Sequence, residues 1–283
     1  MTKIRIENIT KIFNKKNNGR QNGNSQLLAL NNVNLEIRKG EFMALVGPSG
    51  CGKSILIDIV GGITQPNGGK IYIDGKPING PALDRGIVFQ GYALFPWRTA
   101  LENVEFGLEA NGIPKSERSA VAKKYLSLVG LSAFEGRYPY ELSGGMKQRV
   151  AIARALAYDP DILLMDEPFG ALDAQTREIL QVELLKIWEE THKTILFVTH
   201  SIDEAVFLAD RVAVMTARPG VIKSIVNVYL PRPRLDEETK SSPEFAKVRY
   251  DIWRLVKDEV AKSQQEVSYE MSVQSDLAEK VGA

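Results

Sequence analysis

The chain has 283 residues, of which 44% are hydrophobic and 25% charged, as in ordinary globular proteins. This composition excludes a collagen-like chain, a disulfide scaffold and a wholly disordered chain. The 36 basic and 35 acidic residues nearly cancel, so the net charge is +1. Such a chain has no field of one sign to attract phosphates, and we expect no nucleic-acid partner.

The single cysteine, Cys51, cannot form an internal disulfide, which is typical of proteins in a reducing cytoplasm. The N-terminal residues lack the apolar core of a signal peptide. The apolar runs at 162–165 and 195–198 are far shorter than the roughly 20 residues that cross a bilayer. We therefore expect any membrane association to come through a partner protein.

The first half of the chain begins with β structure. Residues 4–13 alternate as in a strand, and β character resumes at 28–42 after an Asn- and Gly-rich stretch, Asn14 to Gln26, that we expect to be a mobile hairpin loop. The next expected elements are a short apolar strand at 42–47, a helix from Gly52 to about Val60, a hairpin that turns at Asp74-Gly75, and a strand at 86–90.

A region from about Tyr92 to Gly144 has helical spacing interrupted by Gly and Pro, which predicts an inserted helical sub-domain. After it, helices and strands alternate: helix 146–159, strand 161–166, helix 174–192, strand 194–200 and helix 201–209. This alternation predicts an α/β fold whose mostly parallel core sheet is covered on both faces.

The C-terminal region from Ser241 carries a helical stripe of apolar residues: Phe245, Val248, Ile252, Leu255, Val256 and Val260. We expect a helix that packs against the core, with a regulatory or partner-facing role as the alternative. The last fifteen or so residues are polar, and we expect them to be frayed.

Residues 47–54 read GPSGCGKS, a full match to the G-x-x-x-x-G-K-[ST] pattern, with a strand before it and a helix after it. Glycines let backbone N–H groups converge on phosphates, and the helix N-terminus adds its positive end. Lys53 supplies a charge for the β- and γ-phosphates, and Ser54 a hydroxyl for Mg²⁺. The alternative is a glycine-rich turn without a ligand. Cys51 occupies a variable position and is expected to fill space rather than react.

Carboxylates follow the apolar strand at 161–166. Because ligands gather beyond the carboxyl ends of parallel strands, we expect Asp166 to help hold Mg²⁺ and Glu167 to face the attacking water. Without the loop at 47–54, a solvated strand end would be the better interpretation. Gln90 and His200 end other strands and are expected at the same edge, whereas His192 is interpreted as structural, at an exposed helix end.

Residues 142–149 read LSGGMKQR and resemble the signature motif of ABC ATPases. The resemblance covers about residues 3–230. It implies a P-loop NTPase fold with an antiparallel N-terminal β sub-domain, within an ATPase domain spanning 1–230. We expect residues 231–283 to form a C-terminal linker, an amphipathic helix and a disordered tail. The resemblance also implies ATP and Mg²⁺ as cofactors, and a dimer in which the signature of one chain closes over ATP held by the other.

The same resemblance implies the site residues. Phe13 stacks on adenine, although a strand-end Phe is more often part of a core. Nucleotide-binding positions are Phe13, Gly47, Pro48, Ser49, Gly50, Cys51, Gly52, Lys53, Ser54, Ile55, Ser143, Gly144, Gly145 and Gln148. Metal-binding positions are Ser54, Gln90 and Asp166. Catalytic positions are Lys53, Gln90, Glu167 as general base and His200 on the γ-phosphate, while residues 171–173 communicate across the dimer.

The sequence departs from the family at Ile55, where a Thr hydroxyl usually meets the α-phosphate. Losing that hydrogen bond should weaken nucleotide binding by about 1 kcal/mol or somewhat more and leave Mg²⁺ coordination intact.

Residues 88–108 and the LPRPR segment at 230–234 resemble importer ATPases for nitrate, taurine or alkanesulfonate, and bicarbonate. This implies an ATPase that powers uptake of a small anion or sulfonate at the cytoplasmic face of the cell membrane. Its partners would be a second ATPase subunit (identical, with a paralogue as the alternative), an integral membrane permease and, indirectly, an extracytoplasmic solute-binding protein. Residues 95–97 either line the groove for a permease helix or form a buried aromatic cluster.

Two other functions fit the phosphate loop less well. A soluble ABC ATPase of DNA repair or translation usually has a second cassette, a long coiled coil or a basic surface, and this chain has none of these in its sequence. A nucleotide-dependent regulator or kinase with the same phosphate loop does not account for residues 142–149 or for the Glu167–His200 pair.

Overall fold

The computed structural model describes residues 1–14, 26–234 and 237–281, without the side chains of residue 237 and of those beyond 265. An antiparallel sheet of four strands has the order β2-β1-β4-β5. Its strands are β1 (Thr2–Asn14), β2 (Gln26–Arg38), β4 (Gly68–Ile73) and β5 (Lys76–Pro77). Most of the expected loop between β1 and β2 lies outside the described residues. The hairpin between β4 and β5 turns at Asp74 and Gly75, as predicted, and both have positive φ.

The core sheet has six strands in the order β10-β9-β3-β8-β7-β6. They are β3 (Phe42–Val46), β6 (Arg85–Val88), β7 (Ile162–Asp166), β8 (Thr194–Val198), β9 (Arg211–Met215) and β10 (Ile222–Asn227). Every pairing is parallel except that of β10 with β9. The predicted parallel core is therefore confirmed, whereas the β9–β10 hairpin at its edge was not predicted.

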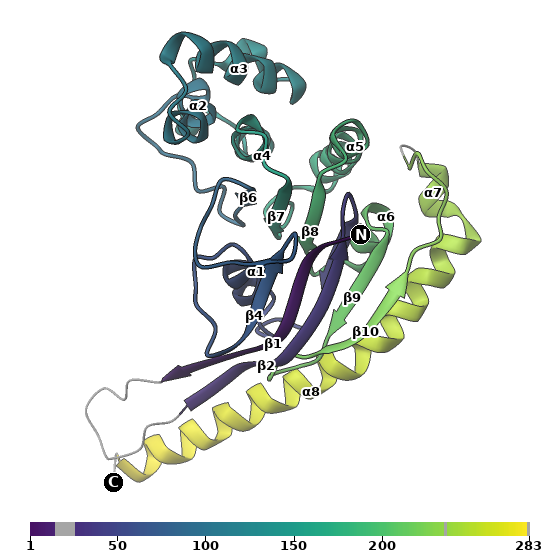
Figure 1. The fold of residues 1–283 in the computed structure, drawn as a ribbon. Coiled ribbons are helices and arrows are strands. Elements are labelled where there is room, and N and C mark those ends of the chain that lie inside the picture. The colour runs from purple at the N-terminus through teal and green to yellow at the C-terminus, as the bar shows by residue number, and fades with distance from the viewer. Residues whose placement is uncertain (15–25, 235–236, 282–283) are drawn as a thin grey trace.

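Two apolar clusters hold these layers together. One joins the antiparallel sheet to one face of the core sheet through α1 (Lys53–Val60), which lies between them (Figure 1). The other covers the opposite face with α4 (Gly144–Ala157), α5 (Ala174–Thr191) and α6 (Ile202–Leu208). Burial on both faces explains why every residue of the central strands β3 and β8 is buried and why all of them except Thr194 are apolar.

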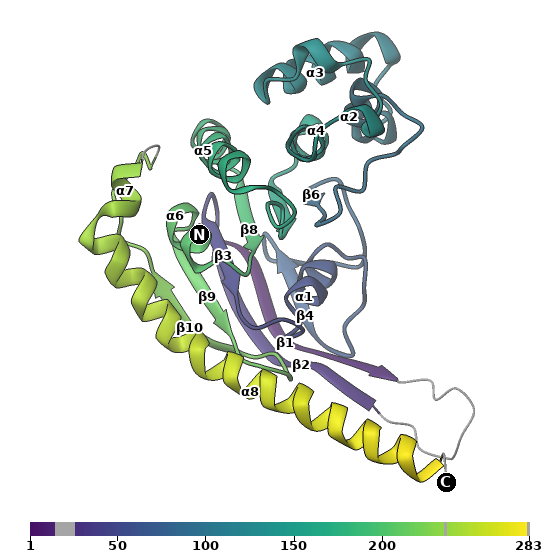
Figure 2. The same cartoon turned by 180° about the vertical axis from the view of Figure 1, so that it is seen from behind.

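Helices α2 (Ala100–Ala110) and α3 (Lys115–Leu128) fall within the expected helical insertion and pack on α4, away from the antiparallel sheet (Figures 1 and 2). Two short 3₁₀ turns, Ser132–Phe134 and Pro139–Glu141, lead into α4. Thr99 and Glu102 form a capping box that starts α2. Before it, Phe95 packs on Phe106 with ring centroids 4.6 Å apart, but Trp97 is 71% exposed, so residues 95–97 are not a buried cluster.

The C-terminal region contains α7 (Glu237–Ser241) and α8 (Pro243–Val281). Helix α8 packs along α6, β9 and β10 and continues past β2 at the outer edge of the molecule (Figure 2). Its buried residues Phe245 and Ile252 belong to the predicted stripe. The helix runs to Val281 where fraying was expected, because no Gly or Pro interrupts it after Pro243. Among the described helices, none has both the length and the hydrophobicity to cross a bilayer.

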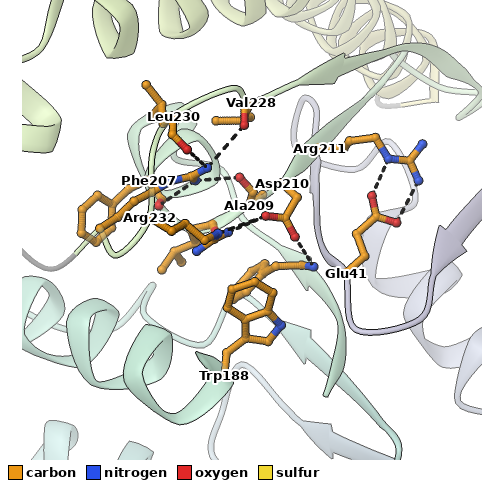
Figure 3. Close-up of polar contacts among 12 residues, drawn as sticks. Glu41, Trp188, Phe207, Ala209, Asp210, Arg211, Val228, Leu230 and Arg232 are labelled. Carbon is orange, nitrogen blue, oxygen red and sulfur yellow. Dashed lines mark hydrogen bonds and ion pairs between the residues drawn. The ribbon is translucent and has the colours of Figure 1, made fainter. Parts of the chain in front are cut away.

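An arginine clasp, Arg232 and Arg234, ties the linker before α7 to the end of α6. Arg232 lies over the Trp188 ring and donates to Oδ1 of Asp210 at 2.7 Å, as Figure 3 shows. Arg234 is 1% exposed, and burial lowers its pKa to about 10. It donates to the backbone carbonyls of Val206, Phe207, Ala209, Val228 and Leu230. The clasp therefore satisfies carbonyls that the end of α6 would leave unpaired.

Candidate nucleotide-binding site

The phosphate loop, residues 47–54, connects the carboxyl end of β3 to α1. Gly50 and Gly52 have φ values of +75° and +104°, which side chains rarely allow. The Lys53 ammonium folds back on the loop and donates to the carbonyls of Gly47 and Pro48 at 3.0 and 3.1 Å. Its side chain is 4% exposed, so the charge lies inside the curve of the loop, where the anion of a nucleotide would bind.

Cys51 and Ile55 support the loop from behind. Cys51 is 1% exposed, and burial raises the pKa of its thiol. This placement agrees with the expected space-filling role. Ile55 is half-buried and packs against the apolar cluster around α1. Where the family usually has a Thr hydroxyl, this chain therefore has a side chain that makes apolar contacts.

A hydroxyl and a carboxylate meet beside the loop. Ser54 Oγ donates to Asp166 Oδ1 at 3.1 Å, and burial is the main cause that raises the pKa of Asp166. Hard oxygen donors of this kind are the ligands that Mg²⁺ prefers, so the two residues fit a magnesium ion. Asp58 lies one helical turn after Ser54, and its charge also raises the pKa of Asp166. Asp58 was not predicted as a site residue, although its i+4 spacing from Ser54 is a usable signal.

Glu167 is held at both carboxylate oxygens. His200 Nε2 lies 2.6 Å from Oε1, and Gln90 Nε2 donates to Oε2 at 3.1 Å. The Nδ1 atom of His200 lies 3.5 Å from the Lys53 ammonium. A neutral imidazole with its proton on Nε2 satisfies both contacts, because it donates to the carboxylate and offers Nδ1 to the ammonium. Gln90, Glu167 and His200, which follow β6, β7 and β8, thus meet at one edge of the core sheet, as predicted.

The Glu167 backbone has φ of +45°, which is uncommon outside glycine. Its N–H donates to the carbonyl of Val198 at 2.9 Å, and its carbonyl accepts from the N–H of Gly170 at 3.1 Å. These bonds compensate for the strained conformation, which turns the chain sharply after β7. Strain of this kind is concentrated at functional sites.

The signature segment starts α4. Ser143 caps the helix and accepts from the N–H of Met146 at 3.3 Å, and a Cβ on Gly145 would lie 2.6 Å from Cγ2 of Thr176. Within the described residues, the structure records no hydrogen bond or ion pair between this segment and the phosphate loop. Gln148 is fully buried, which argues against its predicted direct contact with a nucleotide.

Phe13 lies on β1, and Arg218 lies in the loop after β9. Phe13, at the end of β1, is 40% exposed, and the Lys11 ammonium lies 5.2 Å from its ring centroid. An exposed ring is available for stacking and is not a core residue. Arg218, which was not predicted as a site residue, donates to the carbonyl of Gly50 at 3.4 Å. The other histidine, His192, ends α5 in an exposed left-handed conformation, as its structural interpretation predicted.

Comparison with known proteins agrees with this geometry. The family model described as ABC transporter matches residues 30–170. An uncharacterized ABC transporter ATP-binding protein of Methanocaldococcus jannaschii is 58% identical over 92% of this chain and 94% of its own length. The chain belongs to the ABC transporter family. It is an ATPase of that family, and its predicted family membership and fold are confirmed.

Other relatives carry specific names. The nitrate import ATP-binding protein NrtD of Synechocystis sp. is 49% identical over 82% of this chain and 89% of its own length. The taurine import ATP-binding protein TauB of Jannaschia sp. is 46% identical over 91% of this chain and 95% of its own. A dimeric ATP-binding cassette solved in a post-hydrolysis state with ADP and Pi is 37% identical, with a TM-score of 0.69 over 80% of this chain and 98% of that one.

Proposed function

We propose that this ABC ATPase works as a dimer at the cytoplasmic face of a cell membrane. There it powers an integral permease that imports a small anion or sulfonate. The observation that carries the proposal is the convergence of Lys53, Ser54, Asp166, Glu167 and His200 at one edge of the core sheet. The relatives named for nitrate and taurine import support the class of solute.

The chemical step is assigned to residues of one chain. The phosphate loop and Lys53 bind the phosphates, and the exposed ring of Phe13 stacks on adenine. Glu167 orients a water molecule and accepts its proton during in-line attack on the γ-phosphate. His200 and Gln90 hold the carboxylate in place. We also assign His200 to the γ-phosphate of a bound nucleotide.

A magnesium ion would be held by Ser54 and Asp166 together with the amide oxygen of Gln90. When bound, it supplies charge neutralisation for the β- and γ-phosphates. The ammonium of Lys53 adds a second positive charge from inside the loop, where the transition state gains most from it.

A second chain completes the site in this proposal. Ser143 and the N-terminus of α4 present backbone N–H groups, which suit the phosphates of a nucleotide held by the partner. The dimeric cassette that resembles this chain supports such an arrangement. Opening of the dimer after hydrolysis would drive the permease between its two states, and an extracytoplasmic binding protein would deliver the solute.

The first test measures Mg²⁺-dependent ATP hydrolysis per chain against protein concentration, for the wild-type chain, Ser143→Arg and Ser116→Arg. Ser116 is exposed on α3 and makes a matched control. We expect the rate to rise with concentration and to collapse only in Ser143→Arg. A rate that is flat with concentration and indifferent to Ser143 would refute the composite site.

The second test concerns the base and the transport role. Glu167→Gln should bind ATP, accumulate as a dimer by size-exclusion chromatography and hydrolyse ATP at under about a hundredth of the wild-type rate. Host cells carrying this variant should lose uptake of labelled nitrate or taurine, and the tagged chain should co-purify with a multi-spanning membrane protein. Rapid hydrolysis by Glu167→Gln would exclude Glu167 as the base, and purification without a membrane partner would contradict the importer assignment.

A further inference from the structure

A buried carboxylate, Glu204, lies on α6 one turn after His200. Among the residues that the structure describes, no hydrogen bond or ion pair joins its side chain to a predicted nucleotide-binding residue. Its side chain is 8% exposed. Thr199 Oγ1 donates to its Oε2 at 2.5 Å, and Gln181 Nε2 donates to its Oε1 at 3.2 Å. Burial raises the pKa of Glu204. Burying a carboxylate lowers folding stability unless hydrogen bonds compensate for the lost hydration. We therefore examine which parts of the site the partners of Glu204 connect.

On one side, Glu204 fixes the backbone around His200. The Thr199 hydroxyl that donates to Glu204 also accepts from the N–H of Ser201 at 3.0 Å. The Glu204 N–H in turn donates to Ser201 Oγ at 3.2 Å. His200 is therefore bracketed by two residues that Glu204 holds, one before it and one after it in the chain.

On the other side, Glu204 reaches the segment that follows Glu167. Arg177 Nε lies 3.6 Å from Glu204 Oε1. The same guanidinium donates to the carbonyls of Phe169 at 3.3 Å and Leu172 at 2.7 Å. Residues 169–172 are joined to Glu167 through the bond from the Gly170 N–H to the Glu167 carbonyl.

These contacts close a ring. It runs from Glu167 through residues 169–172 to Arg177 and Glu204, then through Thr199 to His200, and returns to Glu167 across the 2.6 Å contact. We propose that Glu204 is a positioning residue that, with Arg177, holds His200 in register with Glu167 and makes His200 respond to movement of residues 169–172. The inference rests on the proposed roles of Glu167 and His200.

The conservative variant Glu204→Gln separates this role from packing. The amide keeps the volume and can still accept from Thr199. Its NH₂ group would then face the donors of Gln181 and Arg177, so the link to the Arg177 side is lost. We expect kcat for ATP hydrolysis to fall about tenfold, because the ring loses a hydrogen bond to a charged group, while KM changes less than about twofold.

A matched control is Glu41→Gln. Glu41 is a similarly buried carboxylate paired with Arg211 at the opposite edge of the core sheet. We expect its variant to be less stable to heat but to keep kcat within about twofold of wild type. Both variants are assayed as the full chain, below the thermal transition of each.

A spectroscopic readout tests positioning directly, because the chain has only two histidines. With ¹³C-labelled histidine, Glu204→Gln should shift the ring signal of His200 and leave that of His192, which ends α5 at an exposed site, unchanged. An unmoved His200 signal, or kcat within twofold of wild type, would overturn the inference. His200→Ala is assayed alongside: full activity of that variant would sink the proposed role of His200, while the spectra would still report whether Glu204 positions it.

Discussion

Replacing Gly220 with alanine would place a methyl group where the phosphate loop already lies. The new Cβ would be 2.1 Å from the backbone oxygen of Cys51 and 2.7 Å from Cε of Met215. Gly220 cannot move away easily, because its N–H donates to Ala29 at 2.9 Å and its carbonyl accepts from Asn31 at 3.0 Å. Strand β2 thus pins Gly220 from one side while the loop closes on it from the other, so the loop must shift.

The magnitude follows from this overpacking. Inserting a methylene into a filled site costs about 1–3 kcal/mol. Because the displaced atoms belong to the phosphate loop, the same free energy should be lost from nucleotide binding, which raises Kd between about fivefold and 150-fold. Stability should fall as well, with Tm lower by several degrees.

The assay is a fluorescence titration with a fluorescent ATP analogue, together with thermal unfolding followed by circular dichroism. Gly136→Ala is the matched control, since a Cβ there meets no atom within 4 Å. If Gly220→Ala binds nucleotide with wild-type affinity and melts like Gly136→Ala, the packing argument is refuted.

Three further predictions test other parts of the fold. Arg234→Met should lower the free energy of unfolding by more than about 2 kcal/mol, because it leaves buried carbonyls without donors, and urea denaturation showing under about 0.5 kcal/mol would contradict this. Iodoacetamide should alkylate Cys51 at least about tenfold more slowly in the folded chain than in urea at pH 8, because burial raises the thiol pKa. Mass spectrometry follows the label, and equal rates in the two conditions would show that the thiol is accessible. The hydrogen bond from Lys3 lowers the pKa of Asp161 below its ordinary value of 3.8, so the stabilisation is present above that pH and is lost as the pH falls through the lowered value. Lys3→Met should therefore lose less free energy of unfolding on acidification than wild type, as measured by urea titrations at several pH values. If the two chains lose the same amount, the Lys3–Asp161 pair does not cause the acid dependence.

Features carried by contiguous residues were predictable from the sequence. The phosphate loop is a strand, a glycine-rich turn and a helix within one short segment, so its local geometry follows from its residue types. The convergence of Gln90, Glu167 and His200 was predictable as well, because the carboxyl ends of parallel strands share one edge of a sheet. The family was predictable because its signature motif lies within one contiguous segment, residues 142–149.

Other features depend on contacts between segments that are far apart in the chain, and only the tertiary structure decides them. Gln148 looks like part of a ligand-binding motif, yet packing of the helices around α4 buries it completely. Gly220 looks like an ordinary turn glycine, but the loop after β9 meets the phosphate loop there. The ring through Glu204 joins α5, α6 and the segment after β7, so the spacing of residues in the sequence does not predict it. Residue types and short-range spacing determined the chemistry and the edge of the sheet where it occurs. The three-dimensional packing of helices and loops decided which side chains support that chemistry, because burial and close approach are properties of the assembled core.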